Sequence, residues 1–242
     1  MLALIDSDLL VYRIGFTTQE SDEWIAKARL RESVNLILAA TGATSYKMYL
    51  TADSDATAFR RQVYPEYKAN RVAPRPVHYH YLRKLLVDEY EAEIVSGIEA
   101  DDALGIHQMA CLNEDRAAII STNLSSVIVS IDKDLKQIPG YHYNFVRLEH
   151  SLVKPEDALL YFYTQLLTGD SADNIKGVWK CGSVKAAAIL AGLEGNEQAM
   201  FNAVREAYGQ DEEMLLNGRC LWIHKKPDDD WRNHWNLLTS TA

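Results

Sequence analysis

Two short stretches of this chain are rich in acidic residues, whose negative charges would need a balancing positive charge if they were buried together. The stretch GIEADD holds Glu99, Asp101 and Asp102 within four positions, and VSIDKD carries Asp132 and Asp134 out of an apolar run. Carboxylates repel one another and resist burial, so a cluster folded into one pocket requires protons, cationic partners or metal ions. These residues are therefore the first candidates for chemistry.

Further carboxylates follow apolar segments elsewhere. Asp6 ends MLALID, Asp53 ends YKMYLTAD, and the pair in GDSAD has the spacing that shares one face of a helical turn. A single acid at a helix start is more often a cap, but acids at the ends of four strands favour a common cleft. Nine carboxylates are expected to line it: Asp6, Asp53, Glu99, Asp101, Asp102, Asp132, Asp134, Asp170 and Asp173.

The donor type indicates which chemistry the cleft would support. Ligation by oxygen alone suits hard cations such as Mg²⁺ or Mn²⁺ and not zinc. Two such ions about 4 Å apart would activate a water molecule and stabilise the leaving oxygen in phosphoryl transfer. The carboxylates thus indicate a metal-dependent phosphodiester chemistry.

Predicted strands and helices alternate along the part of the chain that must position these acids. Apolar runs predict buried strands over 1–6, 46–53, 92–95 and 126–132. Helical patterns fall over 22–41, 76–90 and 101–112, the first with Ser21 as its cap, Trp24 on its apolar face and Gly42 as its stop. RAAIIS, at 116–121, is read as a short strand or a loop. This order predicts an α/β fold whose mainly parallel sheet gathers a site at the carboxyl ends of its strands.

The chain changes character near residue 150, which we take as a soft boundary between regions 1–150 and 151–242. A helix is expected to begin at Pro155, followed by two short helical pieces around a glycine-containing turn. The remainder is expected to be helical, with WIHKKPDDDW as an exposed loop.

Composition narrows the class of protein. The formal net charge of -9 taken alone disfavours a nucleic-acid partner, but nine carboxylates committed to divalent cations would leave the remaining surface close to neutral. Three widely spaced cysteines indicate free thiols in a reducing compartment and argue against a cysteine-based zinc site. MLALIDSDLL lacks the basic start of a signal peptide, and no apolar run approaches the length of a membrane span. The expectation is a cytoplasmic protein without a membrane partner.

The assembled motifs resemble those of the flap endonuclease superfamily of structure-specific 5′ nucleases, above all bacteriophage 5′-3′ exonucleases and the 5′-nuclease domain of bacterial DNA polymerase I. The motifs are DSDLLVYR, FRRQVYPEYKANR, EADDALG, SIDKDLKQI and GDSADNIKGVWKCG, and they occur in the family's order over roughly residues 1–190. The resemblance implies a PIN-like sheet flanked by helices in residues 1–150. It also implies a short helical arch over about 66–98 and a helix-three-turn-helix DNA-binding region over 151–242.

The resemblance also implies roles for particular residues. Asp6, Asp53, Glu99 and Asp101 would hold a first metal, and Asp102 with the four later acids a second. Lys68 and Arg71 would approach the scissile phosphate, while Tyr67 would stack on a base or pack against the arch. A Lys and an Arg beside an acidic cleft supply charge that a phosphodiester transition state needs. As a plain structural alternative, YKANR would be a solvated turn.

The segment GVWKCGSVKAA resembles the family's turn that grips duplex DNA through backbone amides, with a potassium ion held by its carbonyls. Trp179 and Cys181 depart from the usual pattern, and core packing of Trp179 is an equal alternative to a DNA-facing role. The implied DNA contacts are Tyr67, Gly177, Trp179, Lys180, Gly182, Ser183 and Lys185.

Together these features predict a Mg²⁺- or Mn²⁺-dependent 5′-3′ exonuclease and flap endonuclease. The expected partner is DNA with 5′ ends, flaps or nicks, and the protein is expected to be a monomer in a bacterial or phage-infected cytoplasm. An RNase H-like activity on RNA:DNA hybrids, a non-catalytic branched-DNA-binding subunit and a toxin-type ribonuclease are the alternatives. The filled acidic positions argue against the binding subunit, and the long C-terminal region argues against the toxin class.

Overall fold

The computed structural model describes residues 1–53, 58–114 and 125–240. The segment RAAIIS, expected to be a short strand or a loop, lies outside the described residues. Within the described ranges, no helix is both long enough and apolar enough to cross a membrane.

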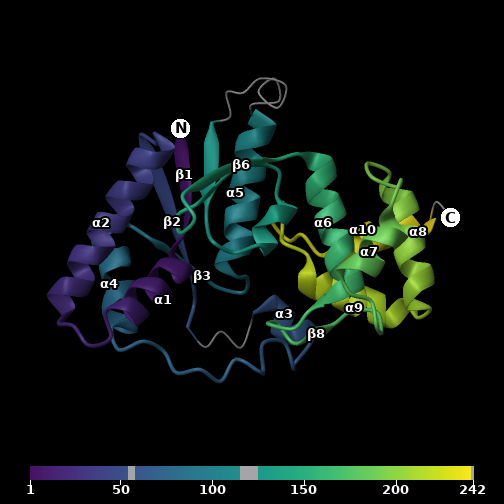
Figure 1. Ribbon diagram of the computed structural model, residues 1–242, viewed down its shortest axis with the longest axis horizontal. Coiled ribbons are helices and arrows are strands. Elements are labelled where there is room, and N and C mark those ends of the chain that lie inside the picture. The colour runs from purple at the N-terminus through teal and green to yellow at the C-terminus, as the bar shows by residue number, and fades with distance from the viewer. Residues whose placement is uncertain (54–57, 115–124, 241–242) are drawn as a thin grey trace.

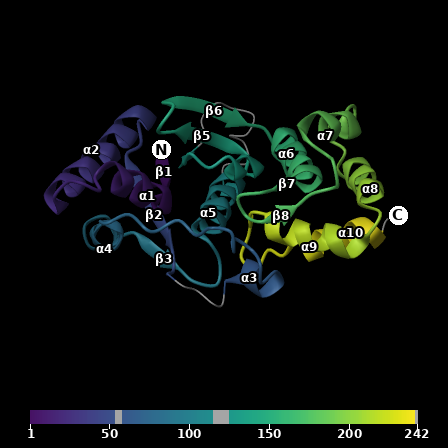
Figure 2. The ribbon, with the colours of Figure 1, turned by 60° about the horizontal axis from the view of Figure 1, so that its bottom comes forward.

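A six-stranded sheet forms the centre of the first region, in the order β3-β2-β1-β4-β5-β6. Neighbouring pairs are parallel through β5, and only β6 runs antiparallel, as the outermost strand in Figure 2. The four predicted strands are confirmed, although the fourth ends at Val129, before its acids. The β5–β6 hairpin was not predicted. The strands are β1 (Leu2–Asp6), β2 (Ser45–Thr51), β3 (Glu93–Val95), β4 (Ser126–Val129), β5 (Gly140–Asn144) and β6 (Glu149–Val153).

Helices cover both faces of this sheet (Figure 1). Successive strand residues point to opposite faces, so Ala3 and Ile5 of β1 pack in one cluster with α1, α2 and α4, while Leu4 packs in another with α5 and η1. Apolar side chains on both faces of a strand therefore require helices on both sides. The helices are α1 (Ser7–Thr17), α2 (Glu23–Thr41), α4 (Tyr79–Tyr90), α5 (Ala100–Glu114) and the 3₁₀ helix η1 (Asp134–Gln137).

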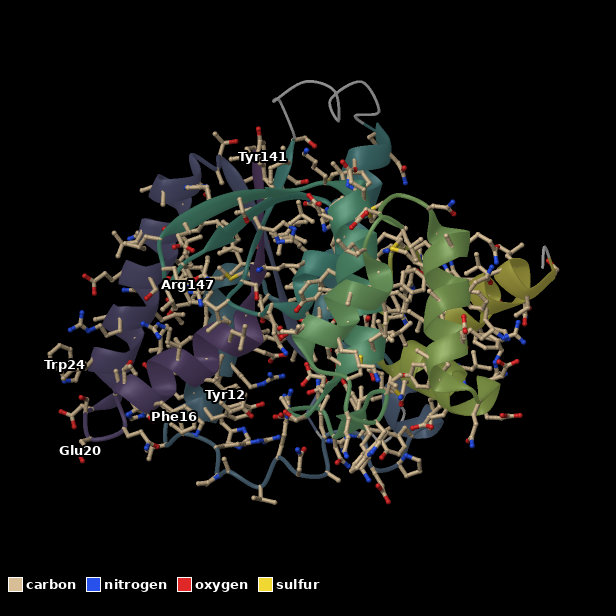
Figure 3. The ribbon with its side chains drawn as sticks, turned by 45° about the vertical axis from the view of Figure 1, so that its right-hand side comes forward. Tyr12, Phe16, Glu20, Trp24, Tyr141 and Arg147 are labelled. Atoms are coloured by element: carbon tan, nitrogen blue, oxygen red, sulfur yellow. The ribbon has the colours of Figure 1, made fainter. Side chains whose placement is uncertain are left out.

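The start of α2 differs from its prediction. Asp22 and not Ser21 occupies the N-cap position, and Trp24 is 67% exposed instead of facing the core. The buried stripe runs through Ala26 and Leu30, so the helix presents its Trp24 side to solvent (Figure 3). Gly42 ends the helix with a left-handed φ of 63°, as predicted.

The chain between the short helix α3 (Phe59–Val63) and α4 carries no helix. In Figure 1 this segment runs along the lower edge of the molecule. The expected helical arch over about 66–98 is therefore wrong for its first part. Its second part, α4, packs against the sheet through Tyr79, Leu82 and Leu86.

The C-terminal region is helical around an aromatic core. Phe162 packs edge-on against Trp222 and Trp231 at ring-centroid distances of 4.9 and 5.4 Å. The prediction of WIHKKPDDDW as an exposed loop is wrong for much of that segment, because both tryptophans and Asp229 are buried. The elements are α6 (Pro155–Thr168), β7 (Gly169–Asp170), β8 (Ile175–Lys176), α7 (Ser183–Leu190), α8 (Glu197–Tyr208), α9 (Asp211–Leu221) and α10 (Trp231–Ser240).

Each of the two regions contributes a side chain to the hydrophobic core of the other. Tyr67, from the first region, lies in the C-terminal core, and Ile223, from the second, packs beneath the sheet with Leu4 and α5. This exchange brings the turn between β7 and β8 next to the carboxyl ends of the strands.

Candidate metal centre

The carboxyl ends of β1, β2 and β4 open into a cleft of about 400 Å³. Parallel strands end at the same edge of a sheet, so acids that follow different strands meet there. Seven of the nine predicted carboxylates line this cleft: Asp6, Asp53, Glu99, Asp101, Asp132, Asp134 and Asp173.

Asp6 occupies the floor of the cleft at the junction of β1 and α1. Its carboxylate accepts hydrogen bonds from the backbone N–H of Leu9, at 3.2 Å, and from the Ser130 hydroxyl, at 2.8 Å. Burial and the nearby Asp8 carboxylate raise the pKa of Asp6 to about 7. Burial and the charges of Asp6 and Asp132 also raise the pKa of Asp101 well above its ordinary value. A divalent cation would relieve this repulsion.

Asp132 and Asp134 are held by the turn that follows β4. The backbone N–H of Asp134 donates to Asp132 Oδ1 at 2.8 Å, and the Ser130 hydroxyl accepts from the N–H of Asp132 at 2.9 Å. Gln165 of α6 donates to Asp134 at 2.8 Å. Burial and the neighbouring Asp132 raise the pKa of Asp134 to about 7. Ser130 thus links two acidic positions, a role that a serine between apolar residues did not signal.

Lys68 enters the cleft with a positive φ of 56°. Its ammonium lies 2.6 Å from Glu99 Oε1 and 3.8 Å from Asp173 Oδ2. Burial raises the pKa of Glu99, but the charges of Lys68 and Arg60 outweigh burial and lower the pKa overall. Arg71 forms an ion pair with Asp173. Both predicted cations therefore lie beside the acids.

Of the two roles expected for Tyr67, stacking on a base does not fit its position in the structure. Its ring is buried, with 4% of the residue exposed, and packs in the C-terminal core. Its hydroxyl lies 2.9 Å from Glu99 Oε2 and 2.9 Å from Asp173 Oδ2. Tyr67 thereby connects two acids that come from different regions.

Asp170 ends β7 and Asp173 lies on the turn between β7 and β8, so the two acids are not on the predicted helical turn. Asp170 accepts from the backbone N–H of Ala172 and pairs with Lys133 at 2.9 Å. It lies behind Asp134, whose pKa its charge helps to raise. Asp173 lines the cleft, whereas Asp170 is not among the lining residues.

Aromatic and basic side chains contact Asp53. The sequence did not indicate that these side chains would lie together. The Tyr79 hydroxyl donates to Asp53 at 2.7 Å, and Arg75 pairs with Asp53 at 2.9 Å. Tyr12 also lines the cleft, with its ring 5.4 Å from that of Tyr79, and lies beside the exposed Phe16 of α1 (Figure 3).

Asp8 is also held in place at this wall of the cleft. It accepts from the backbone N–H of Thr51 at 2.9 Å and from Arg83 at 2.8 Å. Arg83 is buried, so it forms part of this wall of the cleft.

Asp102 is the exception among the predicted metal ligands. It is 0% exposed, and its carboxylate oxygens accept from Arg60 at 2.6 and 2.8 Å and from the backbone N–H groups of Glu99 and His224, both at 3.0 Å. A carboxylate has about four lone-pair sites. All four are engaged, and Asp102 is not among the residues that line the cleft, so we propose a different role for it below.

In the described part of the chain, no three His, Cys, Asp or Glu side chains are already drawn together around a metal position. The acids instead face cationic neighbours, with Lys68 on Glu99, Arg71 on Asp173 and Arg75 on Asp53. The donor set and the raised pKa values fit hard divalent cations, which would exchange with these neighbours.

The predicted DNA-contact residues surround the start of α7. Trp179 is 82% exposed, which excludes the core-packing alternative. Gly182 is the N-cap residue of α7, with open space around it, and Ser183 and Lys185 follow on that helix. Gly177 differs, because a methyl group there would lie 2.3 Å from the backbone nitrogen of Gly169. Its role in this structure is close packing of the β7–β8 hairpin.

Comparison with known proteins places these features in a family. Residues 1–161 match the family model described as 5′-3′ exonuclease, N-terminal resolvase-like domain. The 5′-3′ exonuclease of Buchnera aphidicola subsp. Schizaphis graminum is 28% identical over 224 residues, which cover 85% of this chain and 74% of the relative. DNA polymerase I of Bacillus caldotenax is 30% identical over 248 residues, 91% of this chain but 27% of the polymerase.

Solved structures agree on the fold. The T5 D15 protein co-crystallised with metal ions has a TM-score of 0.66 at 16% identity, covering 91% of this chain and 89% of its own. A pseudo-enzyme-product complex of the bacteriophage T5 D15 flap endonuclease with DNA and metal ions has a TM-score of 0.58 at 16% identity and covers 99% and 98%. The sheet with its acidic cleft and its helical C-terminal region is therefore the 5′-nuclease fold. By its family match, the chain belongs to the 5′-3′ exonuclease family of nucleases.

Proposed function

We propose that this protein is a Mg²⁺- or Mn²⁺-dependent 5′-3′ exonuclease with flap endonuclease activity on double-stranded or branched DNA. The observation that carries the proposal is the convergence of seven carboxylates on one cleft beside Lys68 and Arg71. The metal-containing T5 structures and the DNA complex of the T5 flap endonuclease support it by analogy of fold.

Eight carboxylates would hold the metal ions. Asp6, Asp53, Glu99 and Asp101 would bind one ion directly or through water, and Asp132, Asp134, Asp170 and Asp173 would build a second site. Bound ions would supply activation of water and neutralisation of charge on the leaving oxygen. The cluster of buried acids with raised pKa values is what such ions would stabilise.

Lys68 and Arg71 would position the scissile phosphate. With metal on the acids, the ammonium of Lys68 would be released from Glu99 to interact with a phosphate oxygen. Its location inside the cleft, with 16% of the side chain exposed, limits its reach to groups that enter the cleft. The guanidinium of Arg71, at the rim, can bind phosphate through two parallel N–H groups.

The duplex would lie on the surface formed by residues 177–185. Backbone N–H groups at the start of α7 suit a phosphate, and the exposed Trp179 and Lys180 add an aromatic face and a positive charge. A potassium ion held by carbonyls of the same turn is part of this proposal.

The test is incubation of the protein with 5′-labelled flap, nicked duplex and RNA:DNA hybrid substrates, in Mg²⁺ or in EDTA. The proposal predicts that products appear from 5′ ends only with Mg²⁺ and that DNA substrates are preferred. Preferential cleavage of the hybrid would favour the RNase H-like alternative. Binding without cleavage under all metal conditions would favour the non-catalytic alternative and contradict the proposal.

A further inference from the structure

Arg60 is the most densely bonded cation in the described part of the chain. It lies on α3 and is 2% exposed. Its guanidinium donates to both Asp102 oxygens, to the carbonyl of Cys220 at 2.8 Å and to the carbonyl of Trp222 at 2.7 Å. All of these acceptors are buried, so the side chain has one available orientation.

Asp102, in the first turn of α5, accepts the hydrogen bonds from Arg60. Besides the guanidinium, it accepts the backbone N–H of Glu99, the residue before the helix, and the backbone N–H of His224. An acid that reaches back to the residue preceding its helix fixes the start of that helix. Here the fixed start carries Glu99 and Asp101, which both face the cleft.

The pair therefore joins three segments at one buried point: α3, the start of α5 and the chain that follows α9. The third segment is tightly seated, since a methyl group on Gly105 of α5 would lie 2.4 Å from the carbonyl oxygen of His224. Residues 220–224 are thus held against α5 both by this close contact and by the Arg60–Asp102 pair.

We propose that Arg60 and Asp102 are positioning residues that set Glu99 and Asp101 in the geometry that binds metal. They also make the site dependent on the C-terminal region. This inference rests on the proposed function, and it replaces the role of metal ligand expected for Asp102. Partners that orient the direct ligands typically change metal affinity by about 10- to 100-fold when they are removed.

The test compares Mn²⁺ binding by calorimetry, without DNA, in the full chain and in Asp102→Asn. Asn cannot accept both Arg60 N–H groups and both backbone N–H groups. The expected result is a 10- to 100-fold loss of Mn²⁺ affinity. DNA cleavage by Asp102→Asn should recover when Mn²⁺ is raised to saturation, because the direct ligands are all present.

The matched control is Asp229→Asn. Asp229 is also a buried carboxylate and holds the same chain segment, through Trp222 Nε1 at 2.9 Å and the N–H of Lys225 at 2.8 Å, but it contacts none of the metal-binding acids. This variant should lose stability and keep the Mn²⁺ affinity of the unmodified chain within twofold. Arg60→Lys, which keeps the charge but cannot reach all the acceptors, gives a second measurement should Asp102→Asn not fold.

The outcomes separate the two proposals. Equal Mn²⁺ affinity in Asp102→Asn and the unmodified chain would overturn the positioning role, as would an equal loss in Asp229→Asn. Cleavage that stays absent at saturating Mn²⁺, despite a folded variant, would return Asp102 to the direct ligands and also overturn it. An unmodified chain that binds no Mn²⁺ and cuts no DNA would instead refute the proposed function.

Discussion

The Lys68 ammonium and the Glu99 carboxylate form a 2.6 Å ion pair inside the cleft, between a residue proposed to contact phosphate and one proposed to bind metal. Burial opposes the charge of Lys68, but Glu99 and Asp173 raise its pKa overall. The lysine is therefore charged at neutral pH and ready to exchange one anion for another.

Lys68→Ala should lower the rate of DNA cleavage much more than it lowers affinity. Loss of one charge-stabilising group in an active site typically costs roughly 100- to 1,000-fold in rate. Single-turnover kinetics on a flap substrate would separate the two quantities. Lys84→Ala on α4, which removes an exposed lysine paired with Asp88, is the control and should leave both unchanged. A loss confined to affinity would contradict the assignment.

Asp132→Ala and Asp134→Ala should each abolish cleavage while DNA binding in EDTA stays unchanged or becomes tighter. Both acids lie in the cleft, where removing negative charge reduces repulsion of phosphate. Asp157→Ala in the first turn of α6 makes the same change of net charge at an exposed position and should remain active. Gel-based cleavage and fluorescence anisotropy would measure the two effects. Normal turnover in both cleft variants would exclude the proposed second site.

Metal affinity should depend on pH through Asp6 and Asp134. Burial, followed by the charges of Asp8 for Asp6 and Asp132 for Asp134, raises the pKa of both to about 7. Because protons occupy these carboxyls below that value, Mn²⁺ affinity should rise as pH increases to about 7, by up to roughly tenfold per unit for each displaced proton. Above about pH 8 it should level off.

In the metal-free protein, the same two carboxyls lower the free energy of unfolding as pH rises. Their pKa is raised above the ordinary value of 3.8, so the folded state holds more protons, and their contribution to the free energy of unfolding falls as pH rises to about 7.

The pH dependence of Mn²⁺ affinity can be measured directly. Calorimetry in buffers with different ionisation enthalpies would measure proton release on Mn²⁺ binding. Affinity that is constant from pH 5 to 8 would contradict the raised values.

Gly177→Ala should destabilise the fold by about 1–3 kcal/mol, since the added methyl group would meet the backbone of Gly169 and Leu167. Gly182→Ala is the matched control within the same segment. Gly182 has open space around it and a φ of -86°, so the change in the free energy of unfolding should stay within about 0.5 kcal/mol. Urea denaturation of both variants gives the comparison, and similar midpoints would count against the packing role of Gly177.

The sequence predicted the sheet well because its strands carry simple signals. MLALID and YKMYLTAD are apolar on both faces and end in acids, which is how strands of a parallel sheet between two layers of helices read. The β5–β6 hairpin was missed because its strands alternate tyrosine, histidine and serine with little continuous apolar character.

The limits of sequence reasoning at the site are visible in Asp101 and Asp102. Adjacent residues on a helix point about 100° apart, and here Asp101 lines the cleft while Asp102 points to Arg60. Which of the two lines the cleft depends on Arg60, 42 positions earlier, and on the chain near His224. No local pattern contains that information. The packing of Tyr67 was equally hard to specify from the sequence, because its partners lie in the C-terminal region.

The placement of Tyr67 and Ile223, each in the hydrophobic core of the other region, affects how the protein unfolds. The hydrophobic core of each half includes a buried side chain from the other half. Heating should therefore produce one cooperative transition shared by both halves. A fragment that stops near residue 150 would lack Ile223 in the cluster that packs beneath its sheet.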